Sequence, residues 1–217
     1  MRPLLFLGAF LLLSGEPALA QRSSRVEIRV PPSETRATEG PQVRALRVLS
    51  DARLRDLLRN GFPARLHWRV EVWSTRGWFD DLKGTAEWDV IVRYEPLERR
   101  YEIVRIDADG NPTPLGRTEH FAEVEAIIER PQQAPILPPR RRDRVYYNVS
   151  LDVEMLSVND LDEVEQWLRG ELRPAVRGQR NPGTAVTRGV RTVVAKLLGA
   201  EKRHYEGRSG RFDVAPS

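Results

Sequence analysis

The sequence predicts an α+β domain: a mainly antiparallel sheet of about six strands, able to fold into a sandwich, with three or four packed helices. Three observations support this fold class. Apolar and polar residues alternate with period two in several segments, the longest at 145–155. Turn-forming residues separate consecutive segments of this kind. Other segments place their apolar residues at helical spacing.

The first twenty residues have the parts of an export signal. Arg2 supplies a positive charge, residues 4–13 are apolar, and Ala18-Leu19-Ala20 places small residues around a cleavage point. The apolar run is shorter than the roughly 20 residues that span a membrane. We therefore expect a cleavable signal peptide at 1–20 and an exported protein, periplasmic or secreted. The mature chain would start at Gln21 and contain no membrane span.

The composition of residues 21–217 indicates one soluble domain, because this length suffices for a single core. The chain has no cysteine, which excludes disulfides, zinc-thiolate sites and cysteine catalysis. Its 35 basic residues are interleaved with 31 acidic ones, for a net charge of +4. Nucleic-acid binding requires a more concentrated basic stripe. We therefore expect no nucleic-acid partner, and no motif indicates a cofactor.

The segment after the signal peptide predicts two strands and a helix. Alternation predicts one strand at 26–30 and a second at 43–49. We expect Ser50 to cap a short helix whose leucines share one face, and Asn60-Gly61 to end that helix.

Three strands are predicted next, at 64–73, 88–94 and 101–106. The four-residue segment Glu95-Pro96-Leu97-Glu98 predicts a tight turn between the last two, and Asp109-Gly110-Asn111 predicts a turn at the far end. Strands that follow one another in sequence usually pair. We therefore expect an antiparallel meander.

The C-terminal part predicts a helix at 119–130 and an irregular, proline- and arginine-rich loop at 131–144. The strand at 145–155 has the longest alternation, so we place it centrally in the sheet. Apolar spacing predicts further helices at 160–168 and 186–197.

Several local motifs resemble a known family over residues 49–101. They are Asn60-Gly61-Phe62-Pro63, the strand Arg65 to Trp73, Trp78-Phe79-Asp80, and the hairpin Val92 to Leu97 leading into Arg100-Tyr101. This pattern resembles the exported bacterial family described only as domain of unknown function 4390. The resemblance implies an exported domain and a membrane sensor kinase as the kind of partner. It implies no activity, cofactor or catalytic residue.

Hydrolytic motifs are largely missing. Only His67, His120 and His204 could act as bases, and no two of them lie within one helical turn. Ser209 lies between glycines, but Arg211 replaces the second glycine that a nucleophile elbow requires. Asp80-Asp81 is a candidate carboxylate pair. A hydrolase without a recognisable motif stays an alternative.

The segment 107–111 resembles the start of a calcium-binding loop, because acids alternate before a glycine. Pro112 and Thr118 replace the glycine and the bidentate acid that such a loop needs at its sixth and twelfth positions. A hairpin turn is therefore favoured, with a calcium-dependent structural protein as a third reading.

Two features favour binding over catalysis. Trp78 and Phe79 occupy a predicted connection between strands, where aromatic side chains can anchor a partner, or can fold back over the core. Arg140, Arg141 and Arg142 would attract an anionic group, or form part of a solvated linker. We therefore predict a non-enzymatic binding or interaction module of the bacterial cell envelope, with an unknown envelope protein as its partner.

Overall fold

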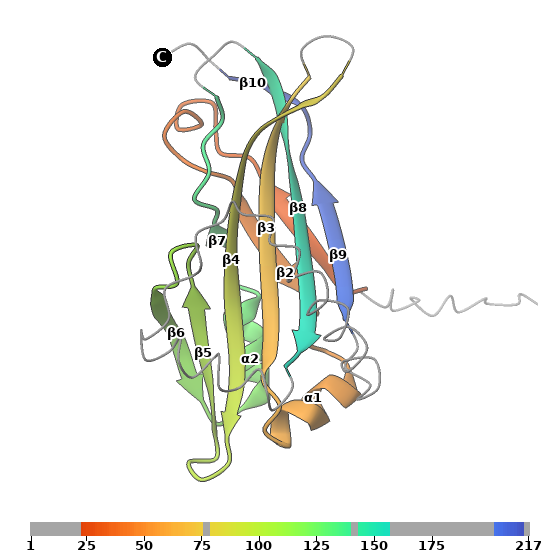
Figure 1. Ribbon diagram of the computed structural model, residues 1–217, viewed down its shortest axis with the longest axis vertical. Coiled ribbons are helices and arrows are strands. Elements are labelled where there is room, and N and C mark those ends of the chain that lie inside the picture. The colour runs from red at the N-terminus through yellow and green to blue at the C-terminus, as the bar shows by residue number, and fades with distance from the viewer. Residues whose placement is uncertain (1–22, 76–78, 140–142, 157–201, 215–217) are drawn as a thin grey trace, which may run out of the picture.

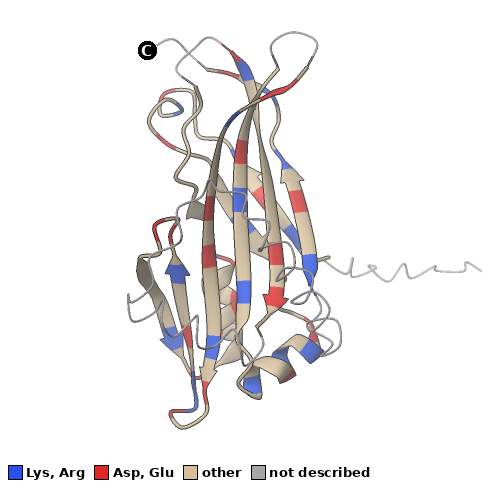
Figure 2. Cartoon of the chain, viewed as in Figure 1, with Lys and Arg blue, Asp and Glu red and all other residues tan. Residues whose placement is uncertain are grey.

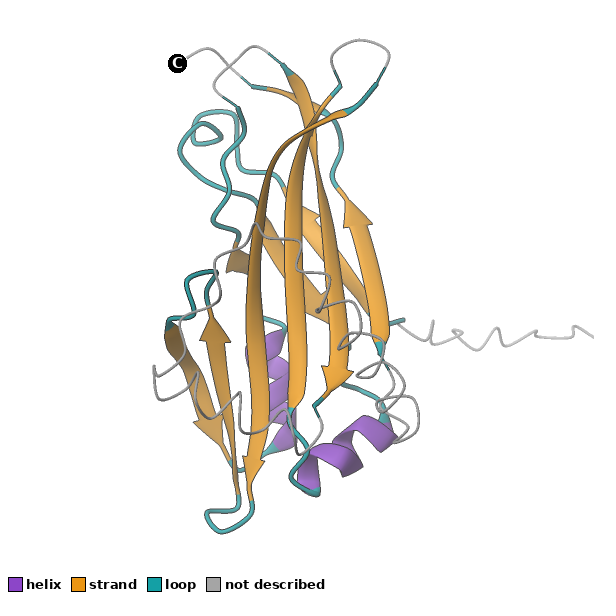
Figure 3. Cartoon of the chain, in the orientation of Figure 1, coloured by secondary structure: helices purple, strands orange, loops and turns teal. Residues whose placement is uncertain are grey.

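The computed structural model describes residues 23–75, 79–139, 143–156 and 202–214 (Figure 1). These residues form two antiparallel sheets and two short helices (Figure 3). The fold is therefore mainly antiparallel β, and the α+β class with three or four helices is corrected for the described part of the chain. The helices predicted at 160–168 and 186–197 lie outside the described residues, as does the predicted signal peptide.

The larger sheet has seven strands and curls into a half-barrel (Figure 1). Its strands are β3 (Ala64–Ser74), β4 (Asp81–Glu95), β5 (Arg100–Ile106), β6 (Pro112–Thr118), β8 (Arg144–Met155), β9 (Arg203–Arg208) and β10 (Phe212–Asp213). The strand order is β10-β8-β3-β4-β5-β6, and β9 also pairs with β8. The predicted meander over β3, β4 and β5 is confirmed. So is the interior position of β8, which pairs with β3 on one side and with β9 and β10 on the other.

The smaller sheet contains β1 (Arg25–Arg29), β2 (Gln42–Leu46) and β7 (Gln132–Gln133), in the order β1-β2-β7. It packs on one face of the larger sheet, which we call the inner face; the opposite face is the outer face. The arrangement is a half-barrel with a small second sheet, rather than a sandwich of two comparable sheets.

The core lies between the two sheets, where the predicted alternation places its apolar residues. Leu66, Trp68 and Val70 of β3 are buried on the inner face, and Trp68 stacks on Trp88 of β4 with ring centroids 5.7 Å apart. Val149 of β8 is also buried in this core. The faces predicted for β3 and β8 are therefore confirmed.

The two helices are α1 (Ala52–Arg59) and α2 (Phe121–Ile128). The N-cap of α1 is Asp51 rather than the predicted Ser50: the Asp51 carboxylate accepts the backbone N–H of Arg53 and Leu54, at 2.8 and 3.2 Å. Ser50 instead donates its hydroxyl to the Arg47 carbonyl at 2.8 Å. Gly61, at φ 88°, follows the end of α1 as predicted.

Other boundaries differ from the sequence prediction. Strand β4 begins at Asp81, well before the predicted residue 88. Strand β6 was not predicted, because Pro112 and Pro114 are unusual in strands; they are tolerated here since β6 is an edge strand. The strands β7, β9 and β10 were not predicted either. Neither described helix is long and apolar enough to cross a membrane.

Candidate functional site

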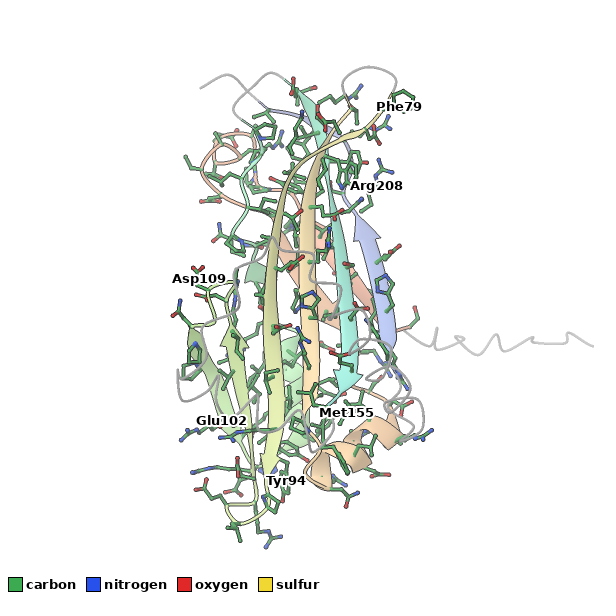
Figure 4. The ribbon with its side chains drawn as sticks, viewed as in Figure 1. Phe79, Tyr94, Glu102, Asp109, Met155 and Arg208 are labelled. Atoms are coloured by element: carbon green, nitrogen blue, oxygen red, sulfur yellow. The ribbon has the colours of Figure 1, made fainter. Side chains whose placement is uncertain are left out.

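One end of the larger sheet carries a group of aromatic and apolar side chains on its outer face. We call this group, together with Arg208, the tip surface; it contains Trp73, Phe79, Leu82, Arg208 and Tyr146, whose ring is buried in contact with the Arg208 guanidinium. These residues come from the end of β3, the connection to β4, the start of β4, the start of β8 and the end of β9. Figure 4 shows Phe79 and Arg208 at this end, while Tyr94 and Met155 lie at the other end.

Strand register brings three of these residues together. Trp73 lies directly opposite Leu82 on β4 and directly opposite Tyr146 on β8. Residues opposite each other on neighbouring strands share a face, with Cβ atoms about 4.5–5.5 Å apart. The Trp73 indole N–H donates to the Glu71 carboxylate at 2.9 Å, which orients the half-buried ring. The result is a cross-strand row of large side chains.

Phe79 is the most exposed member of the tip surface, with 85% of its area accessible. The next residue, Asp80, is tied to two other strands. Its carboxylate accepts the Tyr146 hydroxyl at 2.8 Å and lies 3.6 Å from the Arg208 guanidinium. The Arg208 guanidinium also stacks on the Tyr146 ring, 3.6 Å from its centroid. The backbone next to Phe79 is therefore held by β8 and β9.

The environment of the Tyr146 phenol agrees with this arrangement. Burial of the ring, and then the hydrogen bond to Asp80, raise the pKa of Tyr146 above its usual value. The phenol therefore keeps its proton at neutral pH and remains a donor to the Asp80 carboxylate.

The start of β8 is also hydrogen-bonded to Thr75, the residue that follows the end of β3. Both the backbone N–H and the hydroxyl of Thr75 donate to the Arg144 carbonyl, at 2.8 and 3.0 Å. Arg144 is the last residue of the loop predicted at 131–144, which contains the predicted binding residues Arg140, Arg141 and Arg142, and it is also the first residue of β8. The structure thus brings the chain next to both predicted regions to one end of the sheet.

The predicted site residues have different outcomes. Phe79 is exposed, so the alternative in which it covers the core is wrong for this residue. Trp78, Arg140, Arg141 and Arg142 lie outside the described residues. Their roles in binding, and that of Phe79, stay predictions.

Sequence reasoning missed Leu82, Tyr146 and Arg208. Tyr146 was visible only as a large aromatic residue on the otherwise polar face of the strand at 145–155. Leu82 and Arg208 lie in strands, or parts of strands, that were not predicted. No local signal could show that these residues meet, because the pairing of β8 with β3 joins distant segments.

Charges of both signs surround the tip surface, as Figure 2 shows for this end of the sheet. Asp81 forms an ion pair with Lys83, while Arg144 and Arg211 are exposed. The carboxylates of Asp80 and Asp81, which were a candidate catalytic pair, are thus both engaged by neighbouring side chains.

Elsewhere on the outer face, ion pairs with two histidines lie beside a small buried apolar cluster of Ile91, Val104, Ile106 and Leu156. His67 Nδ1 lies 2.8 Å from the Asp89 carboxylate, which also accepts two hydrogen bonds from Arg65 at 2.9 and 3.1 Å. Burial would raise the pKa of Asp89, but the hydrogen bonds from His67 and Arg65 outweigh burial and lower it. Asp89 is therefore a stable anion on the sheet.

His204 of β9 lies between two acids. Its ring nitrogens are 2.9 Å from Glu206 and 2.7 Å from Asp152. These hydrogen bonds, Glu206 first and Asp152 second, raise the pKa of His204. The imidazole therefore joins β8 to β9 across the outer face, and these contacts favour its protonated form.

The two histidines described above contact acids. His67 and His204 are hydrogen-bonded to carboxylates and, among the described residues, to no hydroxyl group that a base could activate. The Ser209 hydroxyl is engaged by backbone, since it accepts the Tyr147 N–H and donates to the Gly210 carbonyl, both at 2.9 Å.

The segment 107–111 forms the predicted hairpin turn between β5 and β6, with Gly110 at φ 86°. The Asp107 carboxylate accepts the backbone N–H of Asp109 and Asn111, each at 2.9 Å. Its other oxygen accepts the Asn111 amide at 3.1 Å. Among the described residues, no group of three or more histidines and acids is placed to hold a metal ion.

Comparison with known proteins gives one match. The family model described as "Domain of unknown function (DUF4390)" matches residues 44–161, which are more than half of the 217-residue chain. Neither the curated proteins nor the solved structures include a significant match. The match covers α1, the whole meander and β8, so it contains most of the strands that build the tip surface. The chain therefore belongs to the DUF4390 family, as its local motifs suggested.

Proposed function

We propose that this protein is an exported, non-enzymatic binding module of the bacterial cell envelope, and that the tip surface is where it contacts its partner. The exposed Phe79, held beside Tyr146 and Arg208, is the observation that carries the proposal. Export is supported by the signal-like residues 1–20.

The tip surface has the composition of an interface anchor. Tryptophan, tyrosine and arginine are enriched among the residues that dominate binding energy. A phenylalanine buries about 150–250 Å² when it is covered completely, and 85% of Phe79 is available for this. The contacts of Asp80 hold the adjacent backbone before binding, which lowers the conformational entropy lost on association.

The charges around Phe79 favour a protein partner over a lipid surface. Asp80 and Asp81 directly follow Phe79 and pair with Arg208 and Lys83, so the described surface is not the uniformly basic patch that anionic lipid headgroups attract. A protein can match both signs of charge with its own side chains. An envelope protein, such as the membrane sensor kinase that the family resemblance implies, is therefore the proposed partner.

Site-directed photo-crosslinking in the native envelope tests the proposal. A photoreactive residue at Phe79 or Leu82 should capture the same protein, identified by mass spectrometry. Leu97 is the matched control, because it is 99% exposed but lies in the turn between β4 and β5, at the opposite end of the sheet. The proposal fails if Leu97 captures the same protein with equal yield, or if Phe79 and Leu82 capture none.

A second variant tests the arrangement as well as the position. Arg208→Ala removes the stacking on Tyr146 and the contact with Asp80. We expect a severalfold lower crosslinking yield at Phe79 in this background, with the melting temperature nearly unchanged. An unchanged yield would mean that the contacts of Arg208 with Tyr146 and Asp80 do not contribute to binding at Phe79.

A further inference from the structure

Arg105 occupies an unusual position for an arginine of this sheet. It lies on the inner face of β5, directly opposite Val90 of β4 and Thr113 of β6. Its guanidinium lies over the Trp88 ring, with Cζ 4.8 Å from the centroid. Trp88 is buried and stacks on Trp68, so the guanidinium rests on a rigid aromatic pair.

Arg105 has no acidic partner, unlike its neighbours. The other arginines of β3, β4 and β5 each form an ion pair with a carboxylate; they are Arg65, Arg69, Arg93 and Arg100. Within the described part of the chain, no carboxylate and no carbonyl is bonded to Arg105. The charge of Asp107 acts on Arg105, but the Asp107 oxygens already accept hydrogen bonds within the turn. Burial lowers the pKa of Arg105, but the group remains charged at any physiological pH.

Gln132 of β7 adds a second donor beside the same ring. Its amide oxygen accepts the Trp88 indole N–H at 3.1 Å. This contact directs the carbonyl end of the amide toward Trp88, so the NH₂ end is left with two donors. The five N–H donors of a guanidinium and the two of an amide thus lie around one tryptophan, without an acceptor for them among the described residues.

We propose that Arg105 and Gln132 bind an oxyanion, a carboxylate or a phosphate group, beside Trp88 on the inner face of the half-barrel. Donors without acceptors match a ligand that has only acceptors, and the planar guanidinium can hold two oxygens of such a group at once. The desolvation of Arg105 strengthens this attraction relative to an exposed arginine. The site lies on the inner face, apart from the tip surface, and does not depend on the proposed function.

The test is a titration of the purified mature protein followed by nuclear magnetic resonance. Sodium phosphate and sodium acetate are the two probes, each added at constant ionic strength. The signals to follow are the Trp88 indole N–H, the Arg105 Nε–H and the Gln132 side-chain amide. We expect these signals to shift together and to saturate with at least one probe. Saturation with acetate alone identifies a carboxylate ligand, and saturation with phosphate alone identifies a phosphate group.

Variants separate a specific site from a general salt effect. Arg105→Gln should weaken binding about tenfold or more, and Arg105→Lys, which keeps the charge but not the planar fork, should give an intermediate loss. Arg29→Gln is the control, because Arg29 is an exposed arginine of β1, and it should bind as the unmodified protein does. The proposal is overturned if the shifts do not saturate, or if Arg105→Lys and Arg29→Gln bind equally well.

Discussion

Gly40 offers a sharp test of how the small sheet is attached to the rest of the fold. It is buried just before β2, and a Cβ atom at this position would lie 2.0 Å from the Ala134 carbonyl oxygen and 2.7 Å from that of Ile136. Cβ atoms in proteins essentially never approach another heavy atom closer than 3.0 Å. Both obstacles are backbone atoms, so no side-chain rotation can relieve the clash. Gly40→Ala must therefore displace one of the two chains by about 1 Å.

The loss in free energy of unfolding that this displacement causes can be worked out from the contacts. Overpacking in a close-packed interior costs about 1–3 kcal/mol. The Ala134 N–H donates to the Pro41 carbonyl at 2.9 Å, and breaking this buried hydrogen bond would cost about 1–3 kcal/mol more. The total of about 2–6 kcal/mol is a large share of a typical stability of ~5–15 kcal/mol. For a domain of this size, it corresponds to a melting temperature lower by roughly 4–24 °C.

Thermal unfolding followed by circular dichroism is the assay, with Gly210→Ala as the control. A Cβ at Gly210 would meet no atom within 4 Å, so its substitution should change stability by less than about 0.5 kcal/mol. If Gly40→Ala melts within two degrees or so of Gly210→Ala, the packing of residues 40–41 against 134–136 is wrong.

Three further predictions rest on the structure, and a fourth rests on the sequence of the first twenty residues. Val149→Asp places an unpaired charge in the core, which costs several kcal/mol, and should abolish soluble expression, whereas Ser150→Asp on the outer face should be tolerated; equal expression would contradict the assigned faces. Phe79→Ala should reduce partner crosslinking but leave the melting temperature within about 2 °C, since the ring is exposed; a large drop would make Phe79 structural. His204 has a raised pKa in the fold, so its stabilising contribution is complete below its ordinary value of 6.5 and is lost as pH rises through the raised value. The melting temperature should therefore fall as the pH rises from 5.5 to 8.5, and this fall should be smaller in His204→Ala. If the variant and the unmodified protein show the same fall, His204 does not stabilise the fold in this way. Mass spectrometry of the protein from the envelope fraction should find Gln21 at its N-terminus, and an intact chain in membranes would refute cleavage.

Much of the candidate site lay beyond sequence reasoning for a specific reason. The exposed aromatic connection around Phe79 was found, because aromatic residues next to Gly77 in a predicted turn are visible in the sequence itself. The residues that contact Asp80 beside Phe79 were not predicted. Tyr146 and Arg208 are 66 or more residues away from Asp80 along the chain, and only strand pairing brings them to it. The site at Arg105 could not be predicted from the sequence either, because Trp88 and Gln132 lie on different sheets and meet only in the folded chain.

Local sequence patterns were enough to predict the strands with long alternation and the faces that they bury, as β3 and β8 show. Period-two patterning is a local property: whichever strand lies beside β8, its odd-numbered residues must leave water together. The pairing of β3, β4 and β5 could be predicted from their order in the chain, but only the tertiary structure decided that β8 lies beside β3, from which β4 to β7 separate it in sequence. It also made strands of segments without a pattern, such as β6 with its two prolines, because hydrogen bonds to β5 compensate for weak local preference. Pairing of this kind depends on contacts between residues that are far apart in sequence, so the pattern within one segment does not predict it.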